Sequence, residues 1–238
     1  MIGQAANDWR MKHLRRLFAV KFYNNFIRTF TDLPNHTTLL IHSLSGCPLK
    51  CFGCHNYDEI IANTPKEYKT TEDLYEYLRL SGFLFDAVMF SGGEFLINPM
   101  KKVRALLLEV RARFNGVIIV TTSGMYFDKV RALYDENLVD GIHIDMKLPY
   151  HSLDIVEDAY IYQDIMGIKP NINVVGNLLS SVDAVIAHNS KLDQVRTVRY
   201  PLLDDAFFEQ IKAYVDRRKE FHNSEVSYFL NEFVFPAA

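Results

Sequence analysis

Runs of apolar, often β-branched residues alternate with stretches of helical periodicity along most of this chain. Six of these runs predict strands, at residues 37–43, 86–90, 117–121, 141–146, 171–175 and 195–200. Helices are predicted between them: one starts at Thr71 with acidic residues in its first turn, another starts at Pro99, and a late one covers residues 202–215. Strands that alternate with helices indicate βα units, and hence an α/β fold built on a parallel sheet.

Both ends of the chain differ from this pattern. Residues 1–36 carry six Lys and Arg against two Asp, and their apolar positions, which include Phe22 and Phe26, predict an amphipathic helix. We expect this N-terminal helical extension to pack on the main domain, residues 37–238, or on a partner protein; a membrane-surface or transit-peptide role is the alternative. The other end is rich in Tyr and Phe and is expected to cover the last edge of the sheet.

The composition suits one sizeable soluble domain, with 238 residues, 49% of them hydrophobic, and a net formal charge of −3. A transmembrane helix would need a run of about 18 apolar residues, which the sequence does not contain. Duplex nucleic acid would need a concentrated basic face. We therefore expect neither a membrane nor a nucleic acid as a partner, and the lack of an export signal favours a cytoplasmic location.

Polar or glycine-rich segments follow the predicted strands. Ligands of parallel α/β sheets gather at the carboxyl ends of the strands, so these segments are expected to share one rim. They are the cysteine-containing loop after residue 43, Ser91-Gly92-Gly93-Glu94, Thr121-Thr122-Ser123-Gly124, Asp145-Met146-Lys147 and Gly176-Asn177. Their common placement predicts an active site at that rim.

The chain has three cysteines, Cys47, Cys51 and Cys54, and they fall within eight residues. Three thiolates spaced Cys-x3-Cys-x2-Cys can hold an iron–sulfur cube and leave one iron without a protein ligand. Such an iron is open to a cofactor or substrate, so the spacing favours a cluster that takes part in chemistry.

Three other interpretations of the cysteines stay open. His42 or His55 would complete a Cys3His zinc site, and the stretch from Cys51 to His55 also spells a c-type haem signature. A disulfide framework is the third. The haem and disulfide interpretations fit poorly, because both suit exported proteins and three cysteines leave one over.

The cysteine spacing resembles the signature of the radical S-adenosylmethionine (SAM) superfamily. In that superfamily an aromatic residue usually precedes the last cysteine, whereas here Phe52 is aromatic and Gly53 stands beside Cys54. The segment Ser91-Gly92-Gly93-Glu94 resembles the superfamily's Gly-Gly-Glu motif, with Phe95 in place of the usual proline. The resemblance covers roughly residues 37–200. It implies an incomplete (β/α)6 TIM-like barrel with a lateral opening.

Within the superfamily, Cys54-His55-Asn56 and Asp145-Met146-Lys147 resemble the activases of glycyl-radical enzymes. The segment from Asp145 to Pro149, followed by Arg196-Thr197-Val198, is most similar to anaerobic ribonucleotide reductase activating proteins. Pyruvate formate-lyase activases share the Asp-x-Lys element, but they carry an aspartate where this chain has Thr121.

The resemblance implies a [4Fe-4S] cluster on Cys47, Cys51 and Cys54, with SAM as cofactor. Lys147 is expected to contact the SAM carboxylate, and Asp145 to orient Lys147 or to meet the partner, so both join the cysteines as catalytic candidates. The residues implied in SAM binding are Ser91, Gly92, Gly93, Glu94, Thr122, Ser123 and Lys147.

The implied reaction starts with one electron from an external donor such as flavodoxin or ferredoxin. SAM is cleaved to a 5′-deoxyadenosyl radical, which abstracts hydrogen from a glycine of a partner glycyl-radical enzyme. Two other functions stay open. One is a radical SAM enzyme that acts on a small molecule, similar to carboxydeazaguanine synthase, and the other is a zinc- or cluster-stabilised binding module without turnover.

Overall fold

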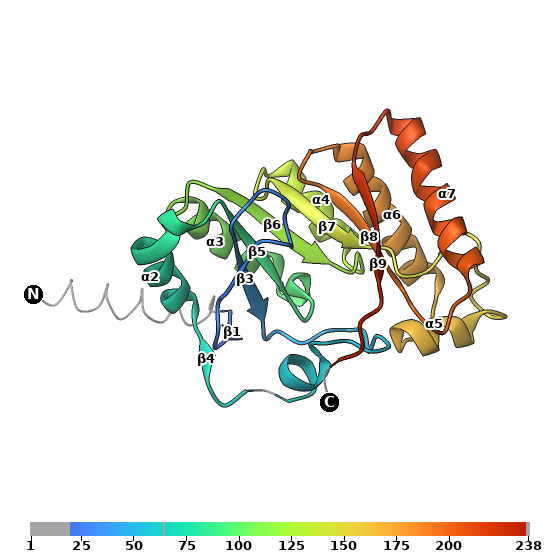
Figure 1. Ribbon diagram of the computed structural model, residues 1–238, viewed down its shortest axis with the longest axis horizontal. Coiled ribbons are helices and arrows are strands. Elements are labelled where there is room, and N and C mark those ends of the chain that lie inside the picture. Colours follow the sequence, from blue (N-terminus) through green and yellow to red (C-terminus); the bar gives the residue numbers. More distant parts are fainter. Residues whose placement is uncertain (1–19, 64, 237–238) are drawn as a thin grey trace, which may run out of the picture.

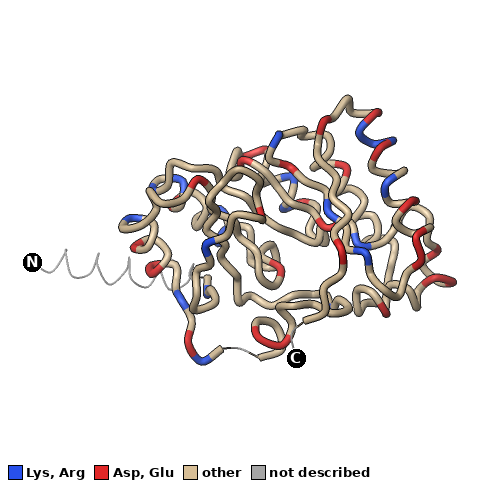
Figure 2. The backbone as a smooth tube through the Cα atoms, viewed as in Figure 1, with Lys and Arg blue, Asp and Glu red and all other residues tan. Residues whose placement is uncertain are grey.

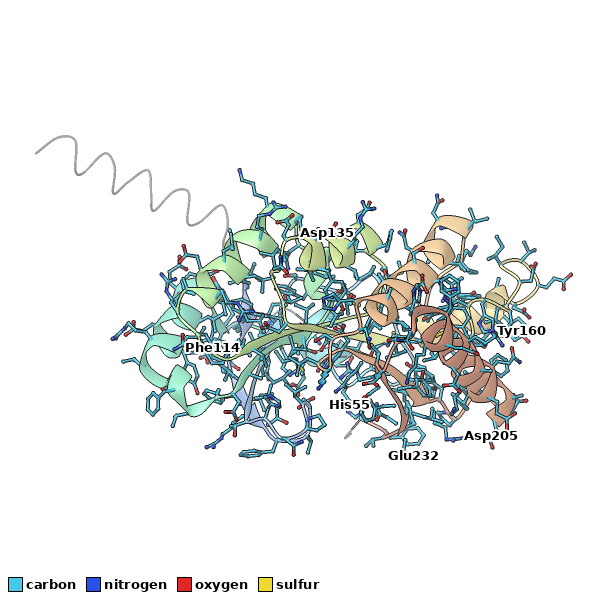
Figure 3. All side chains as sticks on the ribbon, turned by 90° about the horizontal axis from the view of Figure 1, so that it is seen from above. His55, Phe114, Asp135, Tyr160, Asp205 and Glu232 are labelled. Carbon is cyan, nitrogen blue, oxygen red and sulfur yellow. The ribbon has the colours of Figure 1, made fainter. Side chains whose placement is uncertain are left out.

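The computed structural model describes residues 20–63 and 65–236. Its centre is a curved sheet of nine strands with helices packed along one face (Figures 1 and 3). Successive parallel strands form most of the sheet, and they are β3 (Thr38–Ser43), β5 (Ala87–Gly92), β6 (Val117–Thr122), β7 (Gly141–Asp145), β8 (Gln194–Arg199) and β9 (Ser227–Glu232). Because β9 forms one edge and β4 (Tyr68–Lys69) the other, the described sheet stays open. The expected incomplete (β/α)6 barrel is confirmed.

The helices lie between the strands in chain order. The longer ones are α2 (Thr71–Ser81), α3 (Met100–Arg111), α4 (Phe127–Asp135), α5 (Ala159–Met166), α6 (Ile172–His188) and α7 (Asp205–His222). Three short segments complete them: a π-helical turn η1 (Tyr57–Ala62), η2 (Gly82–Leu84) and η3 (Phe95–Ile97). The predicted starts of α2 and α3 are confirmed to within a residue, and the late helix begins three residues after its predicted start and extends to His222.

The predicted strand at residues 171–175 is wrong, because this segment is the first turn of α6. The side chain of Asn171 accepts a hydrogen bond from the amide of Val174 at 3.0 Å, as a helix N-cap does. The apolar residues that looked like a strand belong instead to a helical stripe that continues through Leu178 and Val182 to the core. Gly176-Asn177 therefore lies within a helix and does not follow a strand, although Asn177 Nδ2 donates to Met125 O, just after the segment that follows β6, at 3.2 Å.

The sixth parallel strand is β9, from the Tyr- and Phe-rich end of the chain. It pairs with β8 over its whole length, from Gln194–Ser227 to Arg199–Glu232. The expectation that this end covers the last edge is therefore confirmed, and it does so by extending the sheet.

The helix predicted over residues 1–36 is wrong for the part that the structure describes. Residues 1–19 lie outside the described residues. Beyond them, β1 (Phe22–Tyr23) and β2 (Ile27–Thr29) both pair antiparallel with β3. Phe22 is fully buried against Phe26 and Phe90, so these aromatic residues serve the core of the sheet.

The core has two parts on opposite faces of the sheet. The larger part lies between the sheet and the helices, where Val88 and Phe90 of β5 meet apolar residues of α2 and α3. The alternate residues of β5, Ala87 and Met89, face the inside of the barrel and pack with Leu33 and Ile119. This small cluster fills the amino end of the barrel and leaves the other end for polar groups.

Charges are dispersed over the described surface, with both signs interspersed along α7 (Figure 2). Among the described residues, no helix is both long enough and apolar enough to cross a lipid bilayer.

Candidate active site

The cysteine loop, which we define as residues 44–56, leaves the carboxyl end of β3 and carries all three thiols. Each cysteine is free and half-buried. The loop is tied to the end of α5 by two backbone hydrogen bonds, from the amide of Lys50 to Met166 O at 2.9 Å and from the amide of Phe52 to Ile165 O at 3.0 Å. Its position therefore depends on a helix more than a hundred residues later in the chain.

The glycines of the Gly-Gly-Glu segment allow the cysteine loop to approach it closely. A β-carbon on Gly93 would lie 2.3 Å from Gly46 O, and one on Gly92, whose φ is 106°, would lie 2.6 Å from the amide nitrogen of Ser43. The amide of Glu94 donates to Gly46 O at 2.7 Å, and Asn56 Nδ2 donates to Gly92 O at 3.0 Å. Gly93 thus serves contact with the cysteine loop and Gly92 close packing on the end of β3, roles that the sequence does not indicate.

The Glu94 carboxylate is buried and accepts four hydrogen bonds. Oε1 accepts from the Leu96 amide at 3.1 Å and Thr122 Oγ1 at 2.9 Å; Oε2 accepts from the Ser123 amide at 2.9 Å and Ser123 Oγ at 2.6 Å. Burial raises the pKa of Glu94, and the four donors oppose that shift. Glu94 therefore joins the end of β5 to the end of β6 and brings three of the predicted SAM-binding residues together.

Phe95, which stands where the superfamily usually has proline, is fully buried. Its ring stacks on Phe90 of β5 with the ring centroids 4.9 Å apart. This packing fixes the turn after Glu94 by burial of an aromatic ring rather than by a restricted backbone.

Asp145 and Lys147 form an ion pair at the end of β7, with Lys147 Nζ 3.0 Å from Asp145 Oδ2. Arg196 of β8 donates from Nη2 to the other carboxylate oxygen at 3.2 Å. Burial alone would raise the pKa of Asp145, but the two cations lower it below its ordinary value. Burial alone would lower the pKa of Lys147, but the negative charge of Asp145 outweighs burial and raises this pKa well above its ordinary value.

Arg196 was not predicted as a site residue. It lies directly beside Asp145 in the register of β7 and β8. The resemblance of residues 196–198 to a family element was a signal for it, but only the pairing of the two strands shows which carboxylate it contacts.

The three thiols can bind a metal cluster only after they lose their protons. Burial raises the pKa of Cys47 to about 12 and also raises the pKa of Cys51, while the positive charge of Lys147 opposes both shifts. Thiolates are the species that bind iron, so cluster assembly releases the thiol protons. The bonds between thiolate and iron then offset the cost of burying the negative thiolate charge. Lys147 is therefore electrostatically coupled to the cysteine loop.

The donor set fits a cluster better than a single ion. No group of three or more His, Cys, Asp or Glu side chains within residues 20–63 and 65–236 converges closely enough to hold one metal ion. The cysteines of a cube bind separate irons and need not converge on one point. His55, a candidate fourth zinc ligand, instead donates from Nε2 to Val234 O at 2.8 Å.

A family model for the 4Fe-4S single cluster domain matches residues 37–155, which is half of the chain. The chain belongs to this family. The match includes the three cysteines, Glu94 and the Asp145–Lys147 pair, so a [4Fe-4S] cluster on the cysteine loop is the interpretation that family, spacing and donor set share.

Two solved structures share the fold of this 4Fe-4S domain protein. One is described as "Native anSMEcpe with bound AdoMet" (14% identity, TM-score 0.53, covering 79% of this chain and 49% of that one). The other is HydG, a maturase of the [FeFe]-hydrogenase (11% identity, TM-score 0.57, covering 84% and 43%). This chain thus spans less than half of the length of either structure. A search of curated proteins finds no match.

Family, cysteine signature and fold together support the radical SAM superfamily for this 4Fe-4S protein. The structure brings together the cysteine loop, Glu94 with Thr122 and Ser123, and Asp145 with Lys147, all at the carboxyl ends of neighbouring strands. The expected rim is therefore present, without its Gly176-Asn177 member.

Proposed function

We propose that this protein is a radical SAM activase, which removes a hydrogen atom from a glycine of a partner glycyl-radical enzyme. Anaerobic ribonucleotide reductase is the favoured partner, and an enzyme of the pyruvate formate-lyase type is the next. The proposal depends on one observation, the direct contact between the two segments that resemble activase elements.

Those segments, 145–149 and 196–198, bind each other through three hydrogen bonds. The amide of Met146 donates to Arg196 O at 2.8 Å, Thr197 Oγ1 donates to Met146 O at 2.8 Å, and Arg196 Nη2 donates to Asp145 Oδ1. Residues from two strands thus hold one lysine beside the cysteine loop. This arrangement supports an anion site next to the cluster.

In the proposed reaction, Cys47, Cys51 and Cys54 hold the cluster. With SAM bound there, a reduced cluster would supply the electron for cleavage of the sulfonium carbon–sulfur bond. The Lys147 ammonium binds the SAM carboxylate, and Asp145 keeps this ammonium charged and oriented. These groups bind and position; the bond cleavage itself belongs to the cofactors.

Glu94 is the proposed partner of the SAM ammonium group. Two of its four present donors are backbone amides, of Leu96 and Ser123, which hold the carboxylate in place. The other two are hydroxyl groups. They can rotate away and leave lone pairs of the Glu94 oxygens free to accept from a ligand. Thr122 and Ser123 thereby gain free hydroxyls close to the methionine end of SAM, while Ser91, Gly92 and Gly93 shape the floor of the site.

A glycine loop of a partner protein needs a way into the barrel. The described sheet is open between β9 and the β4–β1 edge, which gives a lateral approach to the rim. The electron comes from an external donor, for which flavodoxin and ferredoxin are the proposed classes.

The experiment uses protein purified and reconstituted without oxygen, reduced with dithionite and mixed with SAM. We expect a reduced cubane EPR signal that shifts on addition of SAM, with formation of 5′-deoxyadenosine. Addition of a candidate glycyl-radical enzyme should then produce a glycyl radical detected by EPR.

The outcomes separate the alternatives. Deoxyadenosine release that is stimulated by small molecules and not by a glycyl-radical enzyme would favour a small-molecule enzyme. A cluster that is indifferent to SAM, or zinc without iron in metal analysis, would contradict the radical mechanism and favour a binding module.

A further inference from the structure

The end of the chain returns to the cysteine loop. Beyond β9, residues 233–236, which we call the tail, run from the sheet edge toward the loop, as the red end of the ribbon shows in Figure 1. Seen from above in Figure 3, the labelled His55 and Glu232 lie near each other on the same side of the molecule. The hydrogen bond from His55 Nε2 to Val234 O, 2.8 Å long, fastens the tail across a separation of 179 residues.

The ring of Phe233 occupies the space above Gly53. A β-carbon on Gly53 would lie 2.3 Å from Cζ and 2.9 Å from Cε2 of this ring, and the φ of Gly53 is +56°, a left-handed conformation. The left-handed conformation favours glycine at this position, and a β-carbon there would have to displace the ring. The ring also packs with Phe52 and Tyr200, at centroid distances of 5.5 and 6.0 Å.

This contact accounts for the departure of the cysteine signature from its usual pattern. The residue before the last cysteine is usually aromatic in the superfamily, whereas this chain has Gly53 there. The glycine leaves a gap next to Cys54, and an aromatic ring from the tail fills it. Aromatic cover at this position is thus provided by the opposite end of the chain.

One side of the cysteine loop already faces solvent. A cavity of about 500 Å³ borders Cys51, Gly53 and Cys54, and the tail residue in its wall is Pro236 rather than Phe233. The Phe233 ring instead fills the gap above Gly53. Without the ring, water and dissolved oxidants would reach the loop from this second side as well.

We propose that Phe233 is a positioning residue of the cluster site, which covers the Cys54 side of the cysteine loop and excludes water from the bound cluster. Solvent exposure is one of the factors that set the reduction potential and the stability of an iron–sulfur cluster. Contact with water favours the more negatively charged, reduced state. The inference rests on the cluster alone and is independent of the partner enzyme.

The test compares Phe233→Ala with Val234→Ala in the reconstituted protein. Val234 is the control, because it belongs to the same tail, its side chain is 64% exposed, and the alanine variant keeps the backbone oxygen that binds His55. Two quantities are measured without SAM or partner: the rate at which iron is lost to a chelator under anaerobic conditions, and the midpoint potential of the cluster.

We expect Phe233→Ala to lose iron about tenfold faster than the wild type and to show a more positive midpoint potential, as loss of a supporting residue around a metal site does. Val234→Ala should match the wild type in both. Phe233→Leu, which restores apolar volume without a ring, should recover part of the slow iron release.

Equal iron release and equal potential in Phe233→Ala and Val234→Ala would overturn the proposal. If Phe233→Ala does not fold, Gly53→Ala decides, because its methyl group displaces the ring while the ring stays in the chain. A Gly53→Ala protein with the wild-type potential and iron release would equally overturn it. Neither result bears on SAM cleavage, which is measured separately.

Discussion

Two aspartates at opposite ends of β7, one buried and one partly exposed, are held in different ways. Asp193, just before β8, is 1% exposed and accepts hydrogen bonds from the Tyr134 hydroxyl, the Ile142 amide, His188 Nδ1 and the Ser190 amide, at 2.7–2.9 Å. Asp145, at the carboxyl end of β7, is held by the cations of Lys147 and Arg196.

The difference separates a structural network from a chemical one. The acceptors of Asp193 are all used within the fold, so this network joins α4, β7 and the loop before β8 and leaves nothing for a ligand. The Lys147 ammonium has three N–H groups, and one of them serves Asp145. Stability therefore concentrates at the amino ends of these strands and binding capacity at the carboxyl ends, as in barrels generally.

Asp193→Asn should give the largest loss of stability. The amide nitrogen of asparagine cannot accept the bonds that one carboxylate oxygen accepts, so buried donors lose their partners. We expect the free energy of unfolding to fall by about 2–4 kcal/mol, and the midpoint of thermal unfolding by about 5–15 °C. Asp128→Asn, at a side chain 91% exposed, is the control and should change little. An unchanged midpoint in Asp193→Asn would contradict the inference that the Asp193 network at the amino end of β7 stabilises the fold.

Gly93→Ala should affect the other end, where the added methyl group meets Gly46 O. We expect overpacking to cost about 1–3 kcal/mol and to displace the cysteine loop. Iron bound per chain after reconstitution should therefore fall well below the wild-type value. Gly176→Ala is the control: a β-carbon there meets nothing within 4 Å, and alanine favours α6. Full iron content in Gly93→Ala would show that the two loops tolerate separation.

Lys147→Ala should separate cluster binding from SAM binding. The thiols and Gly93 stay in place and Arg196 still compensates Asp145. Loss of the Lys147 charge raises the pKa of Cys47 and Cys51, so we expect slower cluster assembly that still reaches normal iron content. Affinity for SAM should fall about 10- to 100-fold, the effect of losing a charged hydrogen bond. The SAM-induced EPR change, titrated with SAM, measures this affinity, with Lys212→Ala on the surface of α7 as control. Unchanged affinity would remove Lys147 from the SAM site.

The smallest effect concerns the pH dependence of stability through His143, which is fully buried in β7. Burial, with the positive charge of Arg196, lowers the pKa of His143 to about 3. The unfolded chain takes up the proton below its ordinary pKa of about 6.5 and the folded chain does not, so stability falls as the pH drops from about 6.5 to about 3. The slope is at most about 1.4 kcal/mol per pH unit.

His143→Gln should reduce this slope but not abolish it, because burial also lowers the pKa of His42 and of His151. His36→Gln, in the loop before β3, should keep the full slope. Urea midpoints of the variants, compared at pH 7 and pH 5, measure the difference. Parallel pH dependence in His143→Gln and the wild type would mean that His143 takes up its proton in the folded state.

The rim was predictable because its residues directly follow strands whose apolar runs are short and distinct. The cysteine spacing, Glu94 and the Asp145–Lys147 pair each belong to a local pattern of a few residues. The prediction for residues 171–175 was wrong because a short β-branched run fits a strand and a helix equally well. The helical spacing of the residues after it and the N-cap at Asn171 indicate a helix.

The remaining features depend on contacts between distant segments, which no local pattern encodes. The role of Gly93 follows from the position of Gly46, and that of Arg196 from the register of β7 and β8. β1 and β2 are two and three residues long, too short for periodicity to reveal them.

The hydrogen bond between His55 and Val234 also has a consequence for biosynthesis. The chain grows from its N-terminus, so the ribosome delivers the cysteine loop 179 residues before the segment that covers it. At ordinary rates of translation this interval lasts roughly 9 to 36 seconds. During that time the thiols have no cover from the tail and remain accessible to whatever supplies iron and sulfide. Docking of residues 233–236 then covers a site whose cysteines emerged 179 residues earlier.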